Sequence, residues 1–401
     1  MDKDILDDML GDIIDTKPIM TKPIDKPITT KEKEIKMENI EIKMEAKEVK
    51  SEVIKIEDNK FLPGVSVDVG TSFICSTRYT EDGKFINKFH RNSLYALDIN
   101  EESADLLERS NYLYIKTENK YYVIGNDAIS LVNALGKGEI IRPMKNGLLN
   151  ESIRESENLL FNVIKCVVGN PIVPRENLRY TVPASPIDKD VNNLFHQNVL
   201  NNLFEKMGYA AKPVNEAMCV IFNCNPIMKS EDGDVPFTGI GISFGAGMAN
   251  VVLTYKGMSL VEFSCTKSGD NIDEQVEKVT GMSKGKIIKI KEKKLNLNKI
   301  DDNDRVQSAL SVYYDETIDR IVKNIENKFK NVGSEIDGEI EIVVSGGTAK
   351  VPGFDKRLEA SIRNSSIPFK IYRVRMADDI FFAVSNGANV RAQSDYKKSL
   401  K

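Results

Sequence analysis

Three short glycine-rich turns are the parts of this sequence best suited to chemistry. Each follows a run of apolar, mostly β-branched residues: VDVGTS at 67–72, ISFGAGMAN at 242–250 and VVSGGTAK at 343–350. Glycine lets backbone amides come close to an anionic ligand, and the N–H groups of such turns can bind phosphate. One such turn is weak evidence, because glycine ends many strands. Three of them suggest two related halves that close on one nucleotide.

Other well-known site patterns do not occur in the sequence. It contains neither GxxxxGK[ST] nor GxGxxG after a strand, which argues against P-loop and Rossmann sites. Two histidines, His90 and His196, and five cysteines without a CxxC pair are present. We therefore do not expect serine–histidine hydrolysis, a zinc site or a disulfide framework.

Charge and hydropathy predict a cytoplasmic protein. No apolar run approaches 18 residues, and the N-terminus is acidic where a signal peptide would be basic. The net charge of -4 belongs to residues 1–60, with 16 acids and 12 lysines, while residues 61–401 hold 44 of each sign. This neutral body predicts no direct nucleic-acid binding.

Strands and helices alternate from Phe61 onward, which predicts an α/β fold. Residues 73–79 and 84–89 are expected to form a hairpin, and 111–125 a second strand pair. Amphipathic spacing predicts helices over 151–168 and over 190–208, the latter closed by Gly208.

The first 60 residues have a different texture. They contain no aromatic residue and repeat short motifs such as TKPI, so we expect a disordered arm. Within it, apolar residues of segment 2–15 recur at helical spacing between six aspartates. The favoured interpretation is a helix that docks on a partner protein; incidental periodicity is the alternative. A membrane helix is least favoured, because such helices usually carry Lys and Arg.

Seven segments occur in the order found in the actin-like ATPase superfamily. Residues 61–401 resemble this superfamily, and most closely its MreB-type bacterial actin homologues. VDVGTS resembles the first phosphate loop, ISFGAGMAN the second, and VVSGGTAKVPGF the adenosine motif. The other matching segments are YVIGNDA with IIRPMKNGLLNE (140–151), KPVNEAMCVIF (212–222), SGDNIDEQV (268–276) and DDIFFAVSNGA (378–388).

The resemblance implies an actin/chaperone-ATPase type fold. Two domains, each with an α/β core, would flank a nucleotide cleft that binds ATP or ADP with Mg²⁺. The implied division is 61–235 for domain I with an outer part near 85–150, 236–383 for domain II with an outer part near 268–310, and 384–401 for a helix that returns to domain I.

The resemblance also assigns roles around the first turn. Asp68 would lie near the metal and its water shell, which suits an oxygen ligand for a hard cation. Gly70, Thr71 and Ser72 would donate to the β- and γ-phosphates. Glu216 would position or activate the water that attacks the γ-phosphate. Each of these residues also has an alternative without a functional role. Asp68 would then cap backbone amides, Gly70–Ser72 would form an ordinary turn, and Glu216 would be a solvated residue at a helix start.

The second turn departs from the family pattern. Relatives usually carry an aspartate where this chain has Ser243, while Gly245 and Gly247 remain for backbone binding of phosphate. A neutral hydroxyl attracts a divalent cation far less than a carboxylate does. We therefore expect nucleotide binding with hydrolysis that is slow or dependent on filament contacts.

The adenosine side is expected to use the third turn and a lysine-rich helix. Gly346, Gly347 and Thr348 would approach the base and ribose. Lys289 matches a family lysine that faces adenine, although Lys286 stands where MreB has glutamate. A solvated lysine-rich face is the alternative.

Two functions remain open from the sequence. One is an ATP-dependent cytoskeletal or cytomotive filament, with self-association and weak ATPase activity. The other is a monomeric actin-fold adaptor of the FtsA or PilM kind, in which nucleotide acts as a structural switch. A heat-shock chaperone and a sugar kinase are less favoured, because no β-rich substrate domain follows and no sugar-binding aspartate can be placed.

Overall fold

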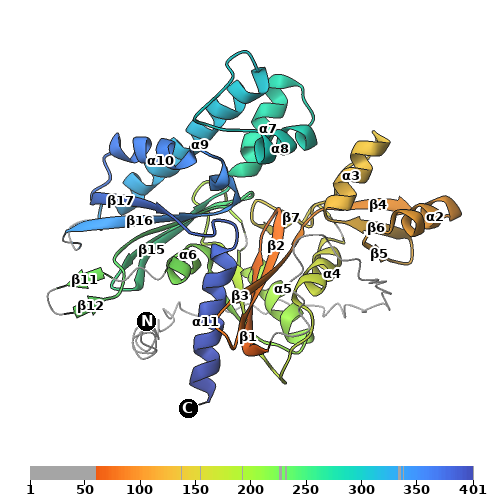
Figure 1. Cartoon of the computed structure of the whole chain (residues 1–401), viewed down its shortest axis with the longest axis horizontal. Coiled ribbons are helices and arrows are strands. Elements are labelled where there is room, and N and C mark those ends of the chain that lie inside the picture. Colours follow the sequence, from red (N-terminus) through yellow and green to blue (C-terminus); the bar gives the residue numbers. More distant parts are fainter. Residues whose placement is uncertain are drawn as a thin grey trace, which may run out of the picture.

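Two five-stranded sheets with the same topology form the body of the protein (Figure 1). The computed structural model describes residues 60–400 apart from 137, 154, 192, 225–227, 231–232, 333–335 and 337. The N-terminal arm and its motif at 2–15 therefore lie outside the described residues. Every structural statement below concerns the described part of the chain.

The strand order of the first sheet is β10-β9-β1-β2-β3, and that of the second is β15-β14-β13-β16-β17. In each sheet the first strand in the chain pairs antiparallel with the second and parallel with the fourth. The strands of the first sheet are β1 (Phe61–Val69), β2 (Phe73–Thr80), β3 (Phe85–Arg91), β9 (Asn177–Val182) and β10 (Ala210–Asn215). Those of the second are β13 (Gly239–Phe244), β14 (Ala249–Tyr255), β15 (Met258–Cys265), β16 (Glu339–Ser345) and β17 (Lys370–Met376). The repeat confirms the predicted α/β fold with two cores.

Helices cover both sheets and give each its own hydrophobic core. Apolar residues of α4 (Ser156–Val168) and α5 (Asn193–Lys206) form one buried cluster with apolar residues of β1 and β9. The second sheet is covered by α9 (Arg305–Phe329) and α10 (Phe354–Arg363). The long helix α9 is capped at its N-terminus by Asp304, whose side chain accepts hydrogen bonds from the N–H groups of Val306 and Gln307. The helices thus make the sheets rigid supports for the turns at their edges.

Smaller elements are attached to each half. A three-stranded sheet of order β4-β6-β5 lies at the right of Figure 1 beyond the first sheet. The strand β3, which the sequence analysis put in the outer part, belongs to the large sheet, because it pairs along its length with β2. The elements of this outer part are β4 (Leu94–Asp98), α2 (Glu101–Ser110), β5 (Tyr114–Lys116), β6 (Lys120–Ile124) and α3 (Asn126–Leu135).

Above the second sheet lie α7 (Gly269–Thr280) and α8 (Lys284–Lys293). The remaining elements are the hairpins β7 (Met144–Lys145) with β8 (Leu148–Leu149) and β11 (Met228–Ser230) with β12 (Gly233–Val235), and the 3-10 turn η3 (Gly347–Lys350).

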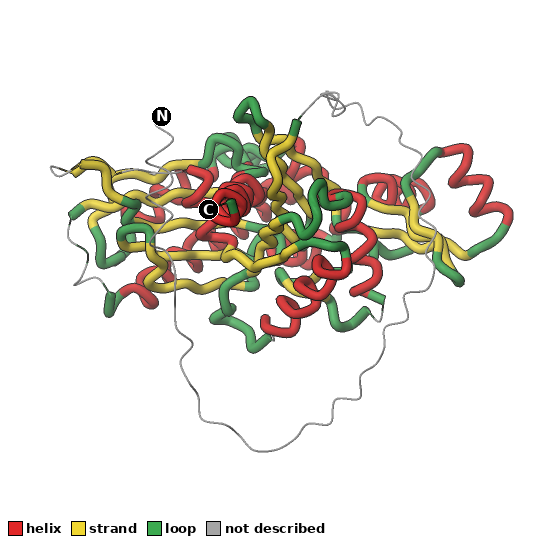
Figure 2. Tube along the Cα trace, turned by 90° about the horizontal axis from the view of Figure 1, so that it is seen from below, coloured by secondary structure: helices red, strands yellow, loops and turns green. Residues whose placement is uncertain are grey.

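Two helices cross between the sheets and exchange sides. The helix α6 (Glu216–Cys224) follows β10 of the first sheet but buries its apolar residues against Val252 and Val343 of the second. The helix α11 (Ala383–Ser399) follows β17 of the second sheet but packs on β1, β9 and β2 of the first. Figure 2 shows this C-terminal helix nearly end-on, close to the middle of the molecule. The chain therefore passes from the second sheet back to the first.

The two crossing helices are in backbone contact. A Cβ atom added to Gly387 of α11 would overlap the carbonyl oxygen of Cys219 in α6. The other side of α11 is polar and hydrogen-bonded to the first sheet. The amide of Asn389 donates to the carbonyl of Thr77 at 2.8 Å, and the hydroxyl of Ser66 donates to the carbonyl of Ser385 at 2.7 Å. Glycine is therefore required at 387 for the close approach of the helices.

None of the helices in the described part of the chain is both long and apolar enough to cross a lipid bilayer.

We predict that Gly387→Ala destabilises the protein by about 1–3 kcal/mol or more, because the added methyl group forces the two helices apart. The matched control is Gly285→Ala in α8, where the nearest atom to an added Cβ is the Asn133 side-chain oxygen at 3.8 Å. That change is expected to be neutral or slightly stabilising, because alanine favours helix. Thermal unfolding followed by circular dichroism measures both; equal midpoints for the two variants would contradict the close crossing.

Candidate functional site

A cleft of about 1070 Å³ opens where the glycine turns of the two sheets face each other. All but one of the residues to which the sequence analysis gave a role line it. These are Asp68, Gly70, Thr71, Ser72, Glu216, Ser243, Gly245, Gly247, Gly346, Gly347 and Thr348. The exception is Lys289, which is exposed on α8 and is not among the lining residues. Lys291 of the same helix lines the cleft instead, and its ammonium group pairs with Asp273 at 2.7 Å.

The first and second glycine turns touch each other. A Cβ atom on Gly247 would overlap the hydroxyl oxygen of Thr71 and the backbone nitrogen of Gly147, so only glycine fits there. The same Thr71 hydroxyl accepts a hydrogen bond from the Gly147 N–H at 2.9 Å. The hairpin of β7 and β8 that carries Gly147 therefore supports the contact between the turns.

The third turn is tied to the second by side-chain hydroxyls. The carbonyl of Gly245 accepts hydrogen bonds from Thr348 at 2.8 Å and from Ser268 at 2.7 Å. Thr348, which was expected to approach the base and ribose, lines the cleft, and its hydroxyl bonds to the neighbouring turn. An added Cβ on Gly347 would meet no atom within 4 Å, so there is open space beside this residue. The three turns thus form one connected lining.

Two carboxylates stand beside the first turn. The Asp68 carboxylate accepts a hydrogen bond from the Thr181 hydroxyl at 2.8 Å, and Glu216 accepts one from the Asn250 amide at 2.8 Å. Burial raises the pKa of Asp68 to about 6, against the lowering effect of the bond from Thr181. Burial and then the negative charge of Asp68 raise the pKa of Glu216 well above its usual range. Among the described residues, no Lys or Arg forms an ion pair with either carboxyl group, which fits these raised pKa values.

This donor set fits a magnesium ion. Mg²⁺ commonly binds through one or two carboxylates, several waters and phosphate oxygens. Asp68 would supply a carboxylate, and the adjoining turns offer room for phosphate and water. No cluster of three or more His, Cys, Asp and Glu side chains suited to holding a metal by itself was found among the described residues. Such an ion would take the rest of its coordination from water and phosphate oxygens.

Neighbouring residues hold both carboxylates in place, and the sequence analysis gave them no role. The Thr181 hydroxyl accepts the N–H of Val69 at 3.1 Å, which fixes its position beside Asp68. The Asn250 side-chain oxygen accepts the N–H of Ala184 at 3.3 Å. Ser243 is buried opposite Asn250 in the register of β13 and β14.

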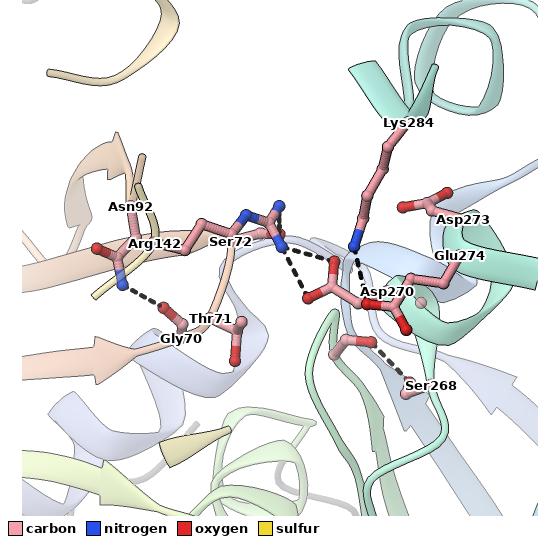
Figure 3. Close-up of polar contacts among 12 residues, drawn as sticks. Gly70, Thr71, Ser72, Asn92, Arg142, Ser268, Asp270, Asp273, Glu274 and Lys284 are labelled. Atoms are coloured by element: carbon pink, nitrogen blue, oxygen red, sulfur yellow. Dashed lines mark hydrogen bonds and ion pairs between the residues drawn. The ribbon is translucent and has the colours of Figure 1, made fainter. Parts of the chain in front are cut away.

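Two arginine–carboxylate pairs cross the cleft. Arg142 donates to both carboxylate oxygens of Asp270 at 2.8 Å (Figure 3). Arg91 donates to both oxygens of Glu292 at 3.0 and 2.9 Å. Burial by itself lowers the pKa of Arg142, whereas the negative charge of Asp270 raises it. The net result is a raised pKa for Arg142. The segments 140–151 and 268–276 were singled out by resemblance, but no residue in them had been assigned this contact.

A buried histidine supports the hairpin behind the first turn. The ring nitrogen Nδ1 of His196 accepts a hydrogen bond from the N–H of Leu149 at 3.2 Å. Burial lowers the pKa of His196 to about 4. The neutral ring is therefore the form that holds β8, and through it Gly147, in position.

These observations can be compared with known proteins. The family model described as Volactin matches residues 64–392. The chain belongs to the Volactin family. A search of curated proteins finds no match.

Solved structures similar to this Volactin-family protein share its fold. The MamK double helical filament has a TM-score of 0.57 at 16% identity, over 82% of this chain and 98% of that one. MreB5 of Spiroplasma citri bound to AMPPNP has a TM-score of 0.61 at 15% identity, over 84% and 98%. The same protein bound to ADP has 0.59 at 16% identity, over 84% and 98%. The predicted MreB-type actin-like fold is thereby confirmed; at these identities the likeness concerns the fold alone.

The pKa of His196 generates a prediction about acid stability. Because its folded pKa of about 4 lies below the ordinary 6.5, the unfolded chain binds more protons between these values. The stability contributed by the neutral ring is therefore full above about pH 6.5 and is lost as the pH falls toward 4, by up to about 3 kcal/mol.

Denaturant unfolding of His196→Gln at several pH values measures this loss. The variant is expected to show a shallower decline between pH 6.5 and 4 than the unchanged protein. Burial also lowers the pKa of His90, so His90→Gln is the control that separates the two histidines. If the free energy of unfolding of His196→Gln fell with pH as steeply as that of the unchanged protein, His196 would not be the source of the loss.

Proposed function

We propose that this Volactin-family protein binds ATP with Mg²⁺ in the cleft and assembles into filaments. The observation that carries the proposal is the meeting of three glycine turns and one unneutralised carboxylate pair on a single cleft. The N–H groups of Gly70 and Gly245 close their own turns by donating to the carbonyls of Phe73 and Met248. The N–H group of Gly247 would therefore bind phosphate, and Gly346 and Gly347 would face the nucleoside.

The magnesium ion would be held near Asp68 and would neutralise phosphate charge when bound. Thr71 and Ser72 would donate to the phosphates. Glu216, oriented by Asn250, would accept a proton from the attacking water or position it. A carboxylate of raised pKa in a half-buried site suits that role better than a solvated one.

Relatives in fold support the nucleotide and the filament. MreB5 of Spiroplasma citri was solved with AMPPNP and with ADP, and MamK as a double helical filament. By analogy of fold, self-association of this chain is the first hypothesis. The monomeric adaptor is the second, and docking of a partner by residues 2–15 remains a prediction from the sequence.

Sedimentation separates the two hypotheses. The full chain with ATP and Mg²⁺ is expected to pellet above a critical concentration and to appear as filaments by electron microscopy. Samples without nucleotide or with EDTA are the controls. Nucleotide binding without any polymer at high concentration would instead support the adaptor.

Hydrolysis is expected to be slow, because Ser243 supplies a hydroxyl where a carboxylate would order the metal or the water. Ser243→Asp should raise phosphate release in excess Mg²⁺ by about tenfold or more, a gain that corresponds to roughly 1.4 kcal/mol of barrier. Ser243→Ala is the matched control and should not be faster than the unchanged protein. Fast turnover by dilute, unpolymerised protein, or no gain in Ser243→Asp, would contradict this interpretation.

A further inference from the structure

Arg142 lies between the first and second glycine turns, beside the place expected for the end of the phosphate chain. It belongs to the segment before β7, lines the cleft and is largely buried. One of its terminal nitrogens donates to the Ser72 hydroxyl at 3.1 Å, and the other to both oxygens of Asp270. Figure 3 shows the guanidinium group between Ser72 and Asp270. Arg142 thus contacts the first turn and the opposite half at once.

Asp270 is in turn attached to the second glycine turn. Its backbone N–H donates to the carbonyl of Ala246 at 2.8 Å, and the preceding Gly269 N–H donates to Gly245 at 3.3 Å. The hydroxyl of Ser268 donates to the same Gly245 carbonyl. The ion pair therefore joins the two turns that would embrace a phosphate chain.

The Arg142 guanidinium is a cation placed against the first turn, where an anionic ligand would meet it. Asp68 and Glu216 also line the cleft, but in the described structure they bond to Thr181 and Asn250 and not to Arg142. Asp270 is therefore the carboxylate with which an anionic ligand would compete. Guanidinium binds phosphate and carboxylate through the same planar pair of N–H groups. A terminal phosphate between the turns would therefore compete with Asp270 for Arg142.

We propose that Arg142 binds the terminal phosphate of a nucleoside triphosphate and exchanges Asp270 for it. A diphosphate, which lacks that group, leaves the Arg142–Asp270 pair intact. This inference rests on the proposed nucleotide binding and names the residue that distinguishes the two nucleotides. Because α7 carries Asp270, release of the pair frees α7 from domain I only in the triphosphate state.

The second cross-cleft pair provides the comparison. Arg91 also reaches across the cleft, but its described hydrogen bonds go to Asn126 and Glu292, and its guanidinium stacks 4.3 Å from the Phe73 ring centroid. It contacts no hydroxyl of the glycine turns in the described hydrogen bonds. Loss of Arg91 should therefore loosen the cleft for both nucleotides alike.

The test measures affinity for AMPPNP and for ADP, each with Mg²⁺, by titration calorimetry of the full chain. Arg142→Gln is expected to weaken AMPPNP binding by roughly tenfold or more and ADP binding by less than about threefold, since a bond to a charged group is lost only with the triphosphate. Asp270→Asn should tighten AMPPNP binding and leave ADP binding nearly unchanged. Arg91→Gln should change both affinities by the same factor.

Folding is checked by circular dichroism. If Arg142→Gln does not fold because Asp270 is left unpaired, the double variant Arg142→Gln/Asp270→Asn removes both charges and should show the same selective loss of AMPPNP. Equal losses for both nucleotides in the arginine variants would overturn the inference and leave Arg142 as a cleft clamp. Failure of the unchanged protein to bind either nucleotide would overturn the proposed function itself.

Discussion

The backbone contact between α6 and α11 at Gly387 and Cys219 is the constraint on which the rest of the structure depends. Each helix continues from one sheet and packs on the other, so the crossing sets the relative position of the two sheets. The glycine turns lie at the ends of strands in those sheets. Their separation, and hence the width of the cleft, follows from how closely the two helices cross.

The two faces of α11 explain how this crossing is specific. Val384 and Ala388 pack with α6 in an apolar cluster, while Ser385 and Asn389 bond to strands of the first sheet. Apolar contact stabilises the crossing without defining its register, whereas buried hydrogen bonds are costly to leave unmade and so fix one position of the helix. The same helix therefore supplies both cohesion and alignment.

The cleft holds two neighbouring carboxyl groups whose ionisation burial disfavours. Asp68 and Glu216 are held by neutral donors, Thr181 and Asn250, and burial raises the pKa of both carboxyls. The arginines that cross the cleft are each satisfied by a carboxylate of the opposite half. These two ion pairs thus join the halves of the protein across the cleft.

Local patterns in the sequence were sufficient for the parts of this protein that depend on near neighbours. Alternating strands and helices, the three glycine turns and the order of seven segments predicted the α/β fold, and the turns proved to line one cleft. Only the tertiary structure decided which side chains meet across it. Lys291 rather than Lys289 reaches the cleft, Thr348 bonds to Gly245, and Arg142 pairs with Asp270. Which face of α8 turns toward the cleft, and which residues more than a hundred positions apart come into contact, depend on how the crossing helices place the two sheets. No short segment of the sequence determines that placement.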